Sequence, residues 1–181
     1  MTDIVRLLPD GLRESFGNGG LPAVDALPRL TAGGEVDSDH VRLIEAADLP
    51  AAVRSGLLLI AEADDASHAA SQSHEGDADC DYWHGIMHRR EPDYGNAGYW
   101  FRRVGRHPAM DDLPAAAKDA ADAFGVQPEA STLLTEEWDP FAMIDLCRLA
   151  EASPDSGLHT FCRAVQWLEM RSLLRHCLLR D

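Results

Sequence analysis

Two histidines and a glutamate recur at helical spacing in the segment 81–108, which reads DYWHGIMHRREPDYGNAGYWFRRVGRHP. His84, His88 and Glu91 are separated by four and three positions, so an α-helix places all three on one face. Two imidazoles and a carboxylate suit a divalent metal such as zinc or iron. The pattern differs from the HExxH metalloprotease motif, because Gly85 stands where that motif has glutamate. The three residues are therefore candidate metal ligands; the alternative is a pair of histidines hydrogen-bonded at a helix boundary.

Two other expected helices carry polar side chains beside their apolar stripes. His68 belongs to the expected helix 51–73, and Glu169 belongs to the expected C-terminal helix 156–179. A glutamate on a buried stripe is costly unless a cation or a metal compensates its charge. Helical bundles build internal sites from side chains on facing helices. We therefore expect His68 or Glu169 to complete the ligand shell, with His68 as the candidate fourth metal ligand. The alternative for Glu169 is an ion-pair network inside the bundle.

Glu169 and Arg103 are the candidate catalytic residues. In a metal-dependent mechanism a metal-bound water is the nucleophile, and Arg103 would hold an anionic group of the substrate. The alternative for Arg103 is an ion pair with one of the many acids of the chain. The remaining histidines are expected in turns or in contact with solvent: His40, His74, His107 and His159.

Apolar residues recur with a period of 3.6 from residue 37 onward, which predicts an all-α fold. We expect a compact multi-helix bundle with a central C-terminal helix and a helical hairpin at 81–104, divided at Pro92. Residues 1–36 contain many glycines and prolines, which predicts a loosely structured lead-in. Residues 37–181 then form a single all-α domain. The helices are expected at 38–49, 51–73, 81–91, 94–104, 113–124, 140–153 and 156–179.

The chain of 181 residues is acidic, with 31 Asp and Glu against 16 Lys and Arg and a formal net charge of −15. Such a field repels phosphate backbones and anionic lipids, so we expect neither nucleic-acid nor membrane binding. No secretory signal is visible at the first residues. The four cysteines form no CxxC pair, which favours reduced, packed thiols in a cytoplasmic protein.

The most distinctive block, YWHGIMHRREPDYGNAGYWFRRVGRHP, occurs together with WDPFAMIDLC and QWLEMRSLLRHC. This combination resembles a family of bacterial proteins of unknown function over roughly residues 57–177. The resemblance implies that the block is a hallmark of that family. It implies no activity, cofactor or catalytic residue.

Residues 83–108 also resemble one tetratricopeptide-type helical hairpin. Trp83 comes early in the first helix, Asp93 and Tyr94 stand at the turn, and Ala97 and Phe101 lie in the second helix. Such units need stacked neighbours to bury their apolar faces, so one unit predicts no solenoid.

Two functions remain open from the sequence. The first is a small protein with a metal site at His84, His88 and Glu91, which would bind a divalent metal such as zinc and perform hydrolytic chemistry. The second is a non-catalytic helical interaction module in which the same residues only brace the hairpin. The partner is a small molecule in the first case and a protein in the second.

Overall fold

The computed structural model describes residues 2–180, with the surroundings of the side chains from residue 4 onward. Over these residues the chain is helical and contains no strand, which confirms the all-α prediction. The α-helices are α1 Thr2–Val5, α2 Asp10–Asn18, α3 Ser38–Ala46, α4 Ala51–Ile60, α5 Asp64–Gln72, α6 Ala78–Arg90, α7 Tyr94–Val104, α8 Leu113–Phe124, α9 Pro140–Glu151 and α10 Gly157–Leu179. Two short 3₁₀ turns, η1 Val24–Ala26 and η2 Pro108–Met110, complete the regular structure.

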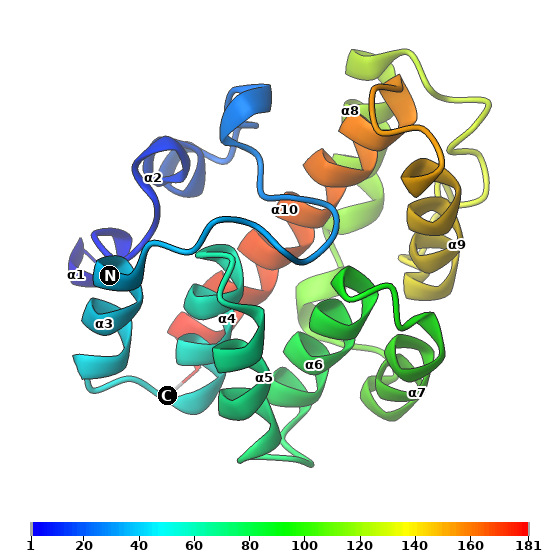
Figure 1. The fold of residues 1–181 in the computed structure, drawn as a ribbon. Helices are drawn as coiled ribbons and strands as arrows, with labels where there is room; N and C mark the ends of the chain where they lie inside the picture. Colours follow the sequence, from blue (N-terminus) through cyan, green and yellow to red (C-terminus); the bar gives the residue numbers. More distant parts are fainter. Residues whose placement is uncertain (1, 181) are drawn as a thin grey trace.

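The C-terminal helix α10 is the centre of the bundle. It packs against α4, α8, α9 and η2, and Figure 1 shows it, in orange and red, running between these elements. Its buried positions fall on more than one face and include Phe161, Trp167 and Leu174. A helix that is apolar over most of its circumference is stable in water only when neighbours cover it on several sides. None of the described helices is long and apolar enough to cross a membrane.

The helices α6 and α7 form the expected hairpin beside α5, and Figure 1 shows the three in a row. Helix α6 begins at Ala78, three residues earlier than expected, because the carboxylate of Asp77 accepts hydrogen bonds from the first backbone amides. It crosses α4 so closely that a Cβ on Gly56 would lie 2.4 Å from the Trp83 ring. This contact fixes the position of α6, and of the histidines on it, relative to α4.

The expected long helix 51–73 is two helices, α4 and α5, and this prediction was wrong. The chain turns at 61–63, although this segment contains no proline or glycine that would predict the end of a helix. The hydroxyl of Ser67 donates to the carbonyl of Ser55 at 2.9 Å, which joins the two arms of the turn. Because α5 folds back, His68 faces α6 instead of continuing the line of α4.

The lead-in 1–36 is more ordered than the glycines and prolines suggested. It contains α1, α2 and η1, and it buries five apolar side chains in the core: Leu8, Leu12, Phe16, Leu27 and Leu30. The amide of Gln166 donates to the carbonyl of Arg29 at 2.8 Å, so α10 also binds the backbone of this segment. The segment therefore contributes to the same core as the rest of the chain.

Candidate metal centre

Three histidines meet between α5 and α6. His68 comes from α5, and His84 and His88 come from successive turns of α6. One ring nitrogen from each residue lies within 4.8 Å of the other two. Tetrahedral zinc at about 2.0–2.1 Å from each nitrogen requires the nitrogens to lie about 3.4 Å apart. The nitrogens lie up to 4.8 Å apart, so the three imidazoles must rotate toward one another to bind one ion.

The local environment keeps the imidazoles of His84 and His88 neutral. His84 is 2% exposed and His88 is 8% exposed, whereas His68 is half-buried. Burial, together with the neighbouring His68 and His88, lowers the pKa of His84 to about 3. Burial also lowers the pKa of His88, although the carboxylate of Glu91 opposes that shift. A neutral imidazole is the form that binds a metal, so His84 needs no deprotonation near neutral pH.

Glu91 has a different position from the one expected of a ligand. Among the described residues it is not part of the group whose ligand atoms converge. Its Oε2 lies 3.1 Å from Nδ1 of His88. A carboxylate at Nδ1 fixes the proton there and leaves the Nε2 lone pair available, which is how metal-bound histidines are commonly oriented. Glu91 is therefore placed to orient His88.

The third helix of the row, α7, covers the cluster with Trp100. The Trp100 ring stacks on His84 with centroids 3.9 Å apart and planes 15° apart. The guanidinium of Arg103 also lies over the Trp100 ring, 4.9 Å from its centroid. Arg103 also donates to Glu75 at 2.6 Å and forms an ion pair with Asp81 at 3.3 Å. Its charge is thus compensated by two acids, so it offers little attraction to an anionic substrate.

The structure does not bring Glu169 to the histidines. Its Oε2 accepts a hydrogen bond from Arg89 at 2.5 Å, and its Oε1 accepts one from the Tyr82 hydroxyl at 3.0 Å. Both partners lie on another face of α6 from His84 and His88. Glu169 and Arg89 are fully buried, so the pair compensates two charges inside the core. This accounts for a glutamate on the apolar stripe of α10 without a metal.

A second cluster, Asp79, His107 and His176, was missed from the sequence, where His107 was expected in a turn or in solvent. His107 is 3% exposed, and its Nε2 lies 2.9 Å from Oδ1 of Asp79. Its Nδ1 accepts a hydrogen bond from the Ala109 amide, so the proton of the neutral ring sits on Nε2. That nitrogen donates to Asp79 and has no lone pair for a metal. The three residues come from separate segments, so no sequence spacing could reveal the cluster.

Arg180 completes this second cluster. Its guanidinium donates to Oδ2 of Asp79 at 2.5 Å, while His176 approaches Oδ1 at 3.4 Å. Burial alone would raise the pKa of Asp79, but the hydrogen bonds from His107 and Arg180 hold it below its usual value. The arrangement is an ion-pair network that ties the end of α10 to the start of α6.

Comparison of the chain with protein-family models, curated proteins and solved structures finds no match. His88 in the first cluster keeps a free Nε2 lone pair, whereas Nε2 of His107 in the second cluster carries the proton that it donates to Asp79. The cluster of His68, His84 and His88 is therefore the better candidate for a metal site.

Proposed function

We propose that the protein binds one divalent metal ion, with zinc as the best-suited ion, through His68, His84 and His88. The observation that carries the proposal is the convergence of one nitrogen from each ring within 4.8 Å. Two features support it: the depressed pKa of His84 and the carboxylate of Glu91 at Nδ1 of His88. Three imidazoles with a carboxylate behind one of them are a ligand arrangement typical of zinc.

Three protein ligands leave a fourth tetrahedral position for water. Structural zinc sites are usually closed by four protein ligands, whereas catalytic sites keep one position open. His68 is half-buried, so the open position can face solvent. A zinc-bound water ionises near neutral pH and becomes a nucleophile, which is the basis for metal-dependent hydrolytic chemistry at this site. Arg103 has no role as an anion anchor in this proposal, because Glu75 and Asp81 engage it.

The acids around the cluster favour a cation over an anionic substrate. Asp65 belongs to α5 and Asp81 to α6, whereas Glu75 and Glu91 lie in the turns that follow these two helices. Glu75 and Asp81 pair with Arg103, so Asp65 and Glu91 supply the negative charge that attracts divalent cations and disfavours phosphate esters. If the site is catalytic, we expect a neutral or cationic substrate.

The test is metal binding by the chain purified without an affinity tag. Zinc added to the metal-free protein should bind at about one ion per chain, and Co²⁺ should give the visible absorption of a tetrahedral nitrogen site. His68→Ala should abolish this binding, since a two-histidine site lacks the third ligand. Because His68 is half-buried, its loss should leave the helical signal in circular dichroism intact. His74→Ala is the matched control, since His74 is exposed and contacts Ser73 instead of the cluster.

Retention of full zinc binding by His68→Ala would contradict the proposed site. Absence of saturable binding by the unmodified chain would leave the non-catalytic interaction module as the better hypothesis. Where zinc does bind, hydrolysis of p-nitrophenyl acetate with and without the metal tests the reactivity of the bound water. A rate that is the same in both conditions would limit the function to metal binding.

A further inference from the structure

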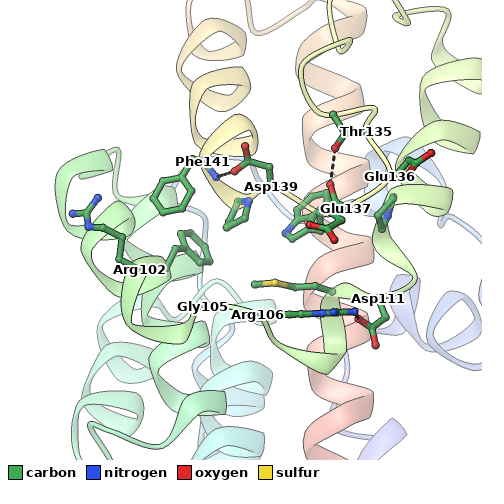
Figure 2. Close-up of a pocket in the computed structure, with 14 residues that line it drawn as sticks. Arg102, Gly105, Arg106, Asp111, Thr135, Glu136, Glu137, Asp139 and Phe141 are labelled. Atoms are coloured by element: carbon green, nitrogen blue, oxygen red, sulfur yellow. Dashed lines mark hydrogen bonds and ion pairs between the residues drawn. The ribbon is translucent and has the colours of Figure 1, made fainter.

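A separate pocket of about 790 Å³ opens on the other side of α7. It lies between the C-terminal end of α7, η2, the start of α8 and the segment 135–139 that leads into α9 (Figure 2). Its volume falls in the range of small-molecule sites. It shares none of its lining residues with the three-histidine cluster, so it is independent of the proposed metal site.

Aromatic and apolar side chains form the walls of this pocket. Phe101, Trp138 and Phe141 contribute three aromatic residues, and Met110 of η2 adds an apolar one. Phe101 and Trp138 are almost fully buried, whereas Phe141 is 39% exposed at the mouth. An exposed phenylalanine beside a pocket adds apolar surface that a ligand can cover. Of the three rings, Phe141 offers the most accessible surface, and the face of an aromatic ring attracts cations.

The charges at the mouth leave a negative excess. The carboxylates of Glu136 and Glu137 have no hydrogen-bond or ion-pair partner within the described part of the chain. Asp139 accepts a hydrogen bond from the Phe141 amide at 2.8 Å, which caps α9, and it has no cationic partner there either. The negative charge of Asp139 offsets the positive end of the α9 dipole. The carboxylates of Glu136 and Glu137 therefore remain without a partner, while Asp139 is engaged at the start of α9.

The two arginines of the pocket do not cancel this excess. Arg106 forms an ion pair with Asp111 at 3.3 Å, so its charge is already compensated. The guanidinium of Arg102 extends back along α7, where its Nη1 would lie 3.4 Å from a Cβ on Gly98. Figure 2 shows it turned away from the other lining side chains. A cation that enters the pocket therefore meets aromatic rings and unpaired carboxylates.

The geometry points to a small organic cation with an alkylated ammonium group as the ligand of this pocket. A bare metal ion needs several oxygen ligands that converge, and no such group of three acids or histidines forms among the described residues of this pocket. An alkylated ammonium instead combines a diffuse positive charge with an apolar surface. This combination matches a site made of aromatic walls and an acidic mouth.

The test uses choline as the probe, measured by calorimetric titration of the full chain. The comparison ligand is the uncharged isostere of choline, in which a tert-butyl group replaces the trimethylammonium group. Choline should bind saturably, and its isostere should bind at least about tenfold more weakly, because it lacks the charge. A short peptide with trimethyllysine is the second probe. Binding of either probe supports the inference, and the tighter one identifies the source of the ammonium group.

Two variants assign the binding to this pocket. The double replacement Glu136→Gln and Glu137→Gln should weaken binding about tenfold, and Phe141→Ala should weaken it severalfold. These side chains are exposed, so the fold should tolerate the changes. Glu129→Gln is the matched control, since it removes an exposed charge from the preceding turn without lining the pocket. Equal affinity for choline and its isostere, failure of both probes to bind, or full binding by the variants would overturn the inference.

Discussion

The position of the proton on a histidine ring separates the two clusters of this protein. At His88 a carboxylate occupies Nδ1, so Nε2 keeps its lone pair. At His107 a backbone amide occupies Nδ1, so Nε2 carries the proton and donates it to Asp79. The sequence could predict that His84, His88 and Glu91 share a face, because one helix carries all three. It could not predict that Glu91 orients a histidine, because that depends on side-chain rotamers.

Replacement of Glu91 by glutamine tests this orienting role. A glutamine amide is a weaker hydrogen-bond partner for Nδ1–H and removes the charge that strengthens His88 as a ligand. We expect the zinc affinity to fall about 10–100-fold with no change in stoichiometry. A competition titration against a zinc chelator measures the change. Glu75→Gln is the control, because Glu75 pairs with Arg103 and touches no histidine of the site; an equal loss in both variants would make the effect one of net charge.

Asp79 gives the protein a predictable acid sensitivity. Its pKa in the folded state is below the usual 3.8, so the unfolded chain binds more protons in this range and the stabilisation is present above about pH 4. It is lost as the pH falls further. Asp79→Asn should lower the free energy of unfolding by about 1–3 kcal/mol near neutral pH. Urea denaturation should show this difference shrinking below about pH 4; a difference that does not vary with pH would contradict the ionic role.

At the scale of the helices, the sequence predicts elements best where a start signal and a sharp stop coincide. Asp139 with Pro140 marks the start of α9, and Gly125 marks the end of α8. The turn at 61–63 has no such signal, because its sequence Ala-Glu-Ala contains neither glycine nor proline and consists of good helix formers. The break is stabilised by distant partners, since the Glu62 carboxylate binds Arg90 of α6. His68 reaches the metal centre only because of this turn, so its partners could not be inferred from the sequence pattern.

The packing of α7 against α6 holds the helix that carries His84 and His88 in place. Phe101 is 1% exposed and approaches Gly85 so closely that a Cβ there would lie 3.1 Å from its ring. Phe101→Ala should lower the free energy of unfolding by about 3–5 kcal/mol, the usual range for a buried aromatic side chain. Tyr99→Ala, on the exposed face of the same helix, should cost less than about 1 kcal/mol. Chemical denaturation of both variants checks the pair; similar losses would show that the packing of α7 is not specific to Phe101.

At the scale of the whole molecule, the hydrophobic core includes residues that precede position 37, where the helical periodicity of the sequence begins. The Trp167 indole of α10 donates to the hydroxyl of Ser15 at 2.8 Å, and Phe16 is buried beside it on α2. Glycines and prolines are frequent in residues 17–34, so the sequence pattern did not indicate the nine-residue helix α2 at the start of this region. The all-α class was predictable because many helices contribute to that signal. The membership of α2 in the core was not, because it depends on long-range contacts with α10.

If α2 belongs to the same core, the first residues must unfold together with the rest of the bundle. Phe16 is 2% exposed, so Phe16→Ala should lower the free energy of unfolding by about 3–5 kcal/mol and shift a single transition. Leu21→Ala is the control, because Leu21 lies in the following loop and is 38% exposed; we expect a change within about 1 kcal/mol. Thermal unfolding followed by circular dichroism and by tryptophan fluorescence measures both. An unchanged main transition in Phe16→Ala would mean that α2 unfolds separately, and the core would then begin at α3.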